Sequence, residues 1–273
     1  MKRSQKRTDV DSTRSHRRGI AGVAEGFFRT FRELSQMILL LPLYAMGCAW
    51  ISLAVLPGLA VFRWAFLATR GWPILGRLWA LGFCACFGYL LYGLSLIVLL
   101  PVLNKALHLK LKEWRGPYYS LPAVPWFIHN GITYIMRFTF LEFITPSPLN
   151  IIFYRWMGMR IGRGTVINSS HISDPCLITM GEKVTIGGSA TIVGHYGQGG
   201  YLVLAPVMIG DRATIGLRAT IMGGVAIGRE AKVLPHSVVM PKTVVPDGEI
   251  WGGVPARKMS VNDLATLTSK KSA

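Results

Sequence analysis

Histidine is the residue type best suited to move protons at neutral pH, and one histidine of this chain stands in an unusual setting. His195 opens the glycine-rich segment HYGQGGYLVLAP, which ends at Pro206. An imidazole with an ordinary pKa of about 6.5 accepts a proton and gives it back, so His195 is a candidate general base. The neighbouring glycines allow the backbone to approach a ligand closely. A solvent-facing loop histidine is the alternative interpretation.

The four cysteines do not indicate a disulfide framework or a metal site. Cys48, Cys84 and Cys86 lie in strongly apolar runs, and no pair, Cys176 included, has the C-x-x-C spacing. We interpret them as small apolar side chains in a reducing compartment.

The elements that must position His195 are short segments repeated with a period of six residues. The aliphatic positions of the repeat are Ile209, Ile215, Ile221, Ile227, Val233 and Val239. Small or β-branched residues follow four places later, at Ala213, Ala219, Val225, Ala231, Ser237 and Thr243. A period of six fits neither an α-helix, with about 3.6 residues per turn, nor the alternation of a hairpin strand. It predicts a chain whose every sixth residue points into one narrow core.

Three such hexads predict one triangular coil of roughly 18 residues, in which each side is a short parallel strand. Glycine follows the aliphatic residue at Gly210, Gly216 and Gly228, and we expect it to relieve corners where φ becomes positive. The pattern is interrupted between Ile192 and Val207. Insertions in such arrays form loops on one face, and these loops often carry function.

The repeat resembles that of the hexapeptide-repeat acyltransferases, from about Tyr154 to Lys258. The likeness includes the closing segment WGGVPARK, which looks like the G-x-P-A-[KR] turn of the family. The β-helix of that family is left-handed, so the resemblance implies an all-β left-handed parallel β-helix over residues 160–258, against the usual right-handed crossover rule. The chain looks most like a membrane-associated branch that resembles the C-terminal domains of ε-poly-lysine synthetase-type proteins.

The resemblance also implies an activity. In the family, acyl-CoA binds between two neighbouring β-helices of a homotrimer, and a loop histidine acts as general base. That histidine removes a proton from the acceptor hydroxyl or amine as it attacks the thioester. His195 stands at the matching position. The resemblance therefore implies a catalytic His195, acyl-CoA (acetyl-CoA by default) as co-substrate, and no metal.

Cofactor-binding residues follow from the same resemblance. Gly223 and Gly224 leave room for the pantetheine arm of CoA. Lys242, Arg257 and Lys258 match family positions near the CoA phosphates, where cationic side chains are expected.

The acceptor side is expected where the repeat slips register, across Ser173-Asp174-Pro175, so that the first coil becomes irregular. His171 is a candidate to line the acceptor, and Asp174 to orient a base or a substrate hydroxyl. His236, next to Pro235 on a regular coil, is expected to face outward. The other histidines lie outside the repeat: His16, His108 and His129.

Two apolar runs precede the repeat. Leu34 to Phe62 gives 29 residues without a charge and Leu78 to Asn104 gives 27, whereas a helix needs roughly 20 to cross a bilayer. We expect two transmembrane or membrane-embedded helices over residues 34–104. Pro42 and Pro57 in the first run permit a kinked or re-entrant shape.

The remaining segments are assigned by composition. Residues 1–33 form a basic arm, disordered at first and then amphipathic. Residues 105–159 are rich in Tyr, Trp and Phe and predict a helical connector at the membrane interface, with a plain packing shoulder as the alternative. Residues 259–273 form a C-terminal tail.

The net charge of +17 first raises the question of nucleic-acid binding. Basic residues gather beside the apolar runs instead, and no nucleic-acid-binding motif is present, so no nucleic-acid partner is expected. Nine Lys and Arg precede the first run and Lys105, Lys110, Lys112 and Arg115 follow the second. The positive-inside rule then predicts an inner-membrane protein with its β-helix facing the cytoplasm.

The sequence thus predicts a membrane-anchored, acyl-CoA-dependent O- or N-acyltransferase. Its acceptor is an envelope glycan, a lipid-linked molecule or a small molecule, and membrane lipid is its other partner. One alternative is a non-catalytic β-helix that scaffolds a membrane complex. A second is a zinc lyase resembling the γ-type carbonic anhydrases. Those enzymes need closely spaced histidine ligands, and the five residues after His195 contain none.

Overall fold

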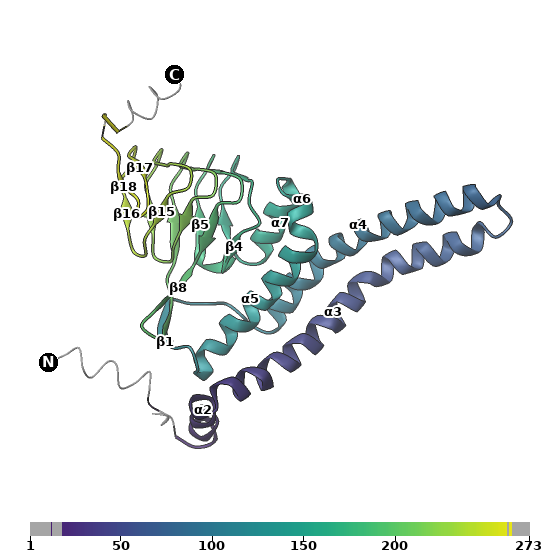
Figure 1. The fold of residues 1–273 in the computed structure, drawn as a ribbon, viewed down its shortest axis with the longest axis horizontal. Coiled ribbons are helices and arrows are strands. Elements are labelled where there is room, and N and C mark those ends of the chain that lie inside the picture. Colours follow the sequence, from purple (N-terminus) through teal and green to yellow (C-terminus); the bar gives the residue numbers. More distant parts are fainter. Residues whose placement is uncertain (1–11, 13–17, 261, 264–273) are drawn as a thin grey trace.

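The computed structural model describes Ser12, residues 18–260 and residues 262–263. The chain forms a stack of short strands and a group of helices, and two long helices project from the stack as a hairpin (Figure 1). The first part of the expected basic arm and most of the expected C-terminal tail lie outside the described residues.

The two apolar runs form the long helices α3 (Arg32–Ala68) and α4 (Ile74–Ala106), which follow the short helix α2 (Ile20–Thr30). By length and composition, both are long and apolar enough to cross a membrane. Only 12% and 22% of their most apolar windows are buried, which is unlike the core helix of a soluble protein. The helices pack closely at Gly58, where an added Cβ would lie 2.9 Å from the Cα of Gly88.

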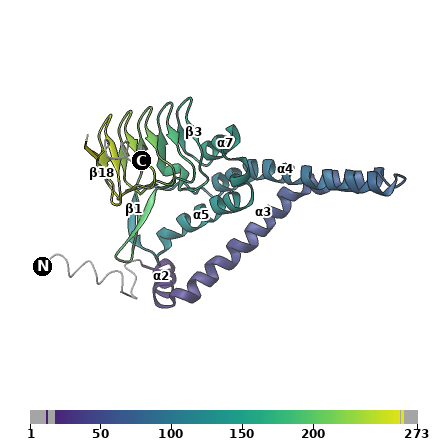
Figure 2. The same ribbon diagram turned by 45° about the horizontal axis from the view of Figure 1, so that its top comes forward.

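A connector of short elements joins the hairpin to the strand stack. It comprises β1 (Trp114–Pro117), the 3₁₀ turn η1 (Leu121–Ala123), α5 (Val124–Met136), the π-helical turn η2 (Arg137–Leu141), α6 (Glu142–Ile144) and α7 (Pro148–Trp156). Both ribbon views place α5 between α3 and the strand stack (Figure 2). The Ser147 hydroxyl caps α7 by accepting a hydrogen bond from the Leu149 N–H at 3.2 Å.

The strand stack is a parallel β-helix with three faces. The first face contains β2 (Arg160–Ile161), β5 (Ile178–Met180), β10 (Val207–Ile209), β13 (Ala226–Ile227) and β16 (Val244–Val245). The second contains β3 (Val166–Ile167), β6 (Thr185–Ile186), β11 (Thr214–Ile215), β14 (Lys232–Val233) and β17 (Ile250–Gly252), and the antiparallel β18 (Arg257–Lys258) ends it. The third contains β4 (Ile172–Ser173), β7 (Thr191–Val193), β12 (Thr220–Ile221) and β15 (Val238–Val239).

The register between neighbouring coils places the aliphatic residues of the predicted repeat directly above one another, in a ladder. Ile215 pairs with Ile186 below it and Val233 above it, and the same stacking recurs on the other two faces. All six predicted ladder residues are buried, with 0–3% of each exposed. The predicted β-helix is therefore confirmed, while its left-handedness stays a prediction.

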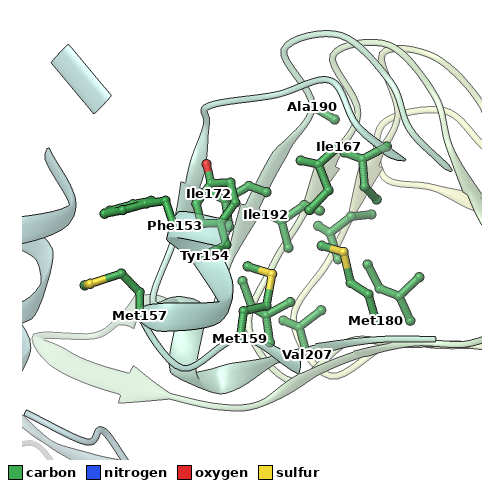
Figure 3. Close-up of a cluster of buried hydrophobic side chains, with 14 of the residues drawn as sticks. Phe153, Tyr154, Met157, Met159, Ile167, Ile172, Met180, Ala190, Ile192 and Val207 are labelled. Carbon is green, nitrogen blue, oxygen red and sulfur yellow. The ribbon is translucent and has the colours of Figure 1, made fainter. Parts of the chain in front are cut away.

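Helix α7 closes the open end of the β-helix core. Phe153 and Tyr154 are fully buried and lie beside Ile172 and Ile192 at the end of the ladder (Figure 3). The hydrophobic core therefore runs without a break from the connector into the coils.

The expected role of the repeat glycines is wrong in one respect. Positive φ occurs at corner residues two places after each glycine, such as Arg212 (56°) and Arg218 (53°), and Gly210 and Gly216 do not adopt it. An added Cβ on Gly216 would instead lie 2.4 Å from the Pro235 nitrogen in the next coil. These glycines are needed because successive coils stack at about 4.8 Å and leave no room for a side chain.

The interruption of the repeat forms a β-hairpin. Its strands β8 (His195–Gln198) and β9 (Tyr201–Leu204) are antiparallel, and β1 of the connector adds to β9 as a third strand. The loop that carries His195 is thus hydrogen-bonded to the connector.

Candidate active site

His195 and Asp174 form a hydrogen-bonded pair where the third face turns into the first. The His195 Nδ1 atom lies 2.5 Å from Asp174 Oδ2. The Asp174 side chain is fully buried, and 21% of the His195 side chain is exposed. The sequence analysis offered Asp174 as an orienter of a base, and the structure brings it to His195.

Local backbone geometry makes this contact possible. Asp174 adopts a left-handed conformation, with φ of 58°, at the irregular turn before η3 (Pro175–Leu177). Gly194 lies directly above it, and an added Cβ there would be 3.1 Å from the Asp174 Cβ. A side chain at position 194 would therefore push the two corners apart.

Two residues of α5 hold the carboxyl group of Asp174. Its Oδ1 atom accepts hydrogen bonds from Trp126 Nε1 and Asn130 Nδ2, both at 2.9 Å. Trp126 and Asn130 lie one helical turn apart, so both point from the same face of α5. The buried carboxyl oxygens are thereby satisfied by donors, as buried polar groups must be.

The same contacts orient the imidazole of His195. Its Nδ1–H donates to Asp174 Oδ2, which leaves the lone pair of Nε2 available to accept a proton. The indole of Trp126 packs against the imidazole edge to face, with ring centroids 4.9 Å apart and an interplanar angle of 70°. The ring is therefore restrained from two sides.

His171 does not join this pair. It precedes β4 while Asp174 follows it, and its Nδ1 lies 3.5 Å from Ser170 Oγ. Burial lowers the pKa of His171, Arg137 lowers it further, and Glu142 opposes them. Ser170 in turn hydrogen-bonds to Glu142. The two predicted acceptor-side residues thus lie at opposite ends of one strand.

Three of the five predicted cofactor residues stack on the corner that holds His195. We define the site corner as Asp174, Gly194–His195, Ala205, Gly223–Gly224 and Lys242, which all connect the third face to the first. An added Cβ on Gly223 would lie 3.1 Å from the His195 nitrogen. The Lys242 N–H donates to Gly223 O at 3.2 Å. The site corner therefore runs from Asp174 past His195 to Lys242.

The other two predicted cofactor residues lie elsewhere. Arg257 and Lys258 form β18, which pairs with β17 on the second face. Lys258 Nζ lies 2.6 Å from Glu249 Oε1, and this contact is the main reason why the pKa of Glu249 is lowered. Within one chain, these two cations are not part of the site corner.

A buried polar chain lies next to the site. His129 on α5 is fully buried, and its Nδ1 lies 2.7 Å from Asn104 Oδ1 while its Nε2 lies 3.9 Å from Cys176 Sγ. Burial lowers the pKa of His129 to about 4, although the nearby Asp174 opposes this. Burial raises the pKa of the Cys176 thiol to about 11. A neutral histidine between an amide and a thiol is the arrangement that these directions favour.

Sequence reasoning missed Trp126, Asn130 and His129. The available signal was local, since Trp126, His129 and Asn130 interrupt an apolar helix with polar groups at helical spacing. Nothing in the sequence tied that face of the helix to Asp174. Within the described part of the chain, no group of three or more His, Cys, Asp and Glu side chains could hold a metal ion.

Comparison with known proteins gives matches to the repeat. Residues 206–233 match the family described as hexapeptide repeat of succinyl-transferase. A delta-poly-L-ornithine synthetase from Acinetobacter baumannii (strain AB307-0294) is 26% identical over 178 residues, which cover 65% of this chain and 13% of that protein. The chain therefore spans about an eighth of the length of that relative.

Solved structures of acetyltransferases also match. A hexapeptide-repeat acetyltransferase from Vibrio cholerae O1 biovar eltor, complexed with acetyl coenzyme A, is 32% identical and covers 38% of this chain and 60% of that one, with a TM-score of 0.34. A maltose O-acetyltransferase from Clostridium difficile 630 is 18% identical and covers 54% and 92%, with a TM-score of 0.43.

Residues 206–233 thus carry a hexapeptide repeat of the succinyl-transferase type, and the family resemblance predicted from the sequence is confirmed. The similarity to a delta-poly-L-ornithine synthetase agrees with the predicted likeness to the ε-poly-lysine synthetase type.

Proposed function

We propose that this protein is a membrane-anchored, acyl-CoA-dependent acyltransferase in which His195 acts as general base. The hydrogen bond between His195 and the buried Asp174, where the repeat is interrupted, carries the proposal. Such a pair orients an imidazole and stabilises the imidazolium that forms when the imidazole takes a proton.

The proposed reaction needs no covalent enzyme intermediate, because a thioester is already activated. The acceptor hydroxyl or amine gives its proton to His195 Nε2 as its oxygen or nitrogen attacks the thioester carbonyl. The tetrahedral intermediate then collapses and its carbon–sulfur bond breaks. The departing CoA thiolate receives the proton from His195, and the acyl group remains on the acceptor.

The site corner supports the proposed place for acyl-CoA. Gly223 and Gly224 carry no side chain above His195, so an extended pantetheine arm can lie against the backbone there. Lys242, farther along the same corner, supplies a cation for a CoA phosphate. In this proposal acetyl is the default acyl group.

Arg257 and Lys258 serve the same ligand in the proposed homotrimer, where they come from a neighbouring β-helix. Two exposed apolar side chains on the first face, Met208 and Val244, lie on either side of the half-buried Ala226 and support such an interface. The left-handed coil remains part of this proposal.

The membrane anchor is proposed from α3 and α4, which are long, apolar and mostly unburied. With the basic flanks of the sequence, they favour an inner-membrane hairpin with the β-helix in the cytoplasm, where acyl-CoA is available.

Replacing His195 by alanine tests the catalytic assignment. We expect release of CoA from acetyl-CoA to fall by roughly two to four orders of magnitude, because the general base is lost. His236→Ala is the matched control, since His236 lies on a regular corner away from the pair. Unchanged turnover in the His195 variant would exclude the role of His195. If the wild-type protein is inactive with every acyl donor, the result favours the alternative of a non-catalytic β-helix that scaffolds a membrane complex.

A further inference from the structure

We infer that the groove between α3 and α5 binds the hydrocarbon chain of a lipid acceptor, whose polar head is then presented to His195. This inference rests on the proposed function, because it names the substrate class of the same site.

The groove is large and apolar. Its volume is about 710 Å³, and it is lined by α3 between Leu40 and Ile51 and by α5 and η2 between Trp126 and Thr139. Aliphatic and aromatic side chains make up most of the lining. A pocket of this size and character suits an alkyl chain.

One end of the groove meets the site. Trp126 and Asn130 line the groove, and the same two side chains donate hydrogen bonds to Asp174. The Asn130 Oδ1 atom is buried and has no hydrogen-bond partner among the residues that the structure describes. An acceptor without a hydrogen-bond partner therefore lies on the residue that joins the groove to the site.

The direction of the groove fits an inserted lipid. Helices α3 and α5 run the same way, because an added Cβ on Gly131 would lie 3.2 Å from Leu43 and one on Gly47 would lie 3.3 Å from Ile135. The end of the groove at Trp126 is thus near His195. The other end points along α3 toward the turn that joins α3 to α4 (Figure 1). At about 1.5 Å per residue, the stretch from Leu40 to Ile51 is roughly 17 Å long. That length is close to one leaflet of the hydrocarbon core, about 15 Å.

The groove suits the acceptor better than the acyl donor. CoA is proposed along the site corner from Gly223 to Lys242, while Trp126 and Asn130 approach His195 from the Asp174 side. A second cavity of about 270 Å³ shares Phe127 with the groove. Its other lining residues are Arg29, Arg32, Pro117, Tyr118, Tyr119 and Gly200. It leaves space for a polar head beside the hairpin that carries His195.

Photolabelling tests the inference without requiring turnover. The full chain is placed in vesicles of phosphatidylethanolamine and phosphatidylglycerol with a trace of a long-chain alcohol that carries a diazirine at its tail. After irradiation, mass spectrometry maps the adducts. We expect them on α3 between Leu40 and Ile51 and on α5 and η2 between Trp126 and Thr139.

Two cysteines provide a matched pair of variants. Cys48 is exposed and lines the groove, whereas Cys86 is exposed on α4 outside it. Cys48→Trp fills the groove and should lower its adducts by roughly tenfold, which corresponds to about 1.4 kcal/mol of binding. Cys86→Trp should label like the wild type. Tyr134→Arg, which puts a charge in the wall, is a second groove variant with the same expected loss.

Several outcomes overturn the inference. Adducts spread evenly over the outer faces of α3 and α4, or adducts unchanged in both groove variants, exclude a specific chain site. Adducts that disappear with palmitoyl-CoA but not with acetyl-CoA assign the groove to the donor instead. Intact labelling of the groove in a protein whose His195→Ala variant keeps full acyl transfer would exclude the proposed role of His195 and leave the chain site standing.

Discussion

Asp174 connects the β-helix to the helical part of the protein through a single carboxyl group. One oxygen faces His195 and the other accepts hydrogen bonds from Trp126 and Asn130. The proposed base is therefore oriented by residues from two separate elements, the turn after β4 and helix α5. A substitution of Asp174, Trp126 or Asn130 should lower the rate of proton transfer even where the fold is kept.

Asp174→Asn tests this arrangement directly. An asparagine amide can donate to Nδ1 and would favour the tautomer with hydrogen on Nε2, which cannot accept a proton. We expect kcat/KM to fall by roughly two to four orders of magnitude. The rate of CoA release is measured as a function of pH. The variant should lose the increase in rate with pH that a general base produces.

A matched control for that change is Asp247→Asn. Asp247 also sits at a corner and accepts a hydrogen bond, from the Arg229 N–H at 2.7 Å. It is far along the coil from His195, so its variant should keep wild-type turnover. Equal losses in both variants would attribute the effect to corner stability and not to the tautomer.

His129 should make stability depend on pH. Its pKa is about 4 in the folded protein against 6.5 in the unfolded chain. Between these values the unfolded state binds the proton and the folded state does not. Stability is therefore full above pH 6.5 and decreases as pH falls to about 4, by about 3 kcal/mol in total.

Unfolding of the full chain in nanodiscs, followed at several pH values, measures this loss. His129→Gln cannot titrate, so the wild type should lose stability relative to that variant on acidification. A difference between the two proteins that stays constant with pH would contradict the assignment to His129.

At the scale of elements, the β-helix coils were the most predictable part. Each hexad carries its own aliphatic and small residue, so the pattern is visible within a short window of sequence. The helix α5 was less predictable. Its contacts to Asp174 join residues 44 and 48 positions apart, and no period or motif marks such a pairing. Asp174 itself was found only because the repeat slips there.

The repeat glycines show a second limit of sequence reasoning. The sequence shows where these glycines lie, but two different physical causes can require a glycine at such a position. Positive φ and lack of space both select glycine. Only the stacking of coils shows that Gly216 is required by space, since an added Cβ would lie 2.4 Å from the backbone of the next coil.

Gly216→Ala should therefore destabilise the β-helix by about 3 kcal/mol, because backbone must shift to admit the methyl group. Gly248→Ala is its control. Gly248 has a φ of 70° with nothing within 4 Å of an added Cβ, so only backbone strain of about 1–2 kcal/mol applies. Thermal unfolding followed by circular dichroism compares the two. A larger loss in Gly248→Ala would contradict the spatial explanation.

At the scale of the whole molecule, the proposed trimer makes a prediction about the first face. Met208 is 56% exposed there. Met208→Asp places a charge in the proposed interface, so it should shift the protein from trimer to monomer and abolish acyl transfer. Light scattering after size exclusion in detergent gives the mass of each species.

Leu217→Asp is the control for that experiment, since Leu217 is similarly exposed, at 48%, but lies at the corner between the second and third faces. It should leave the trimer intact. Dissociation by Leu217→Asp alone would move the interface to that corner. A monomeric, active wild type would exclude the shared CoA site.

The third strand that β1 adds to the His195 hairpin, together with the two α5 side chains on Asp174, has a consequence for modularity. The hairpin of α3 and α4, with the connector at residues 105–159, does more than attach the β-helix to a membrane. Another pair of membrane helices could not replace it. A chimera with a foreign anchor would reach the same membrane, yet its His195 would lack the contacts that orient it. Evolution can therefore lengthen or trim the distal coils more freely than it can replace the segment from residue 105 to residue 159.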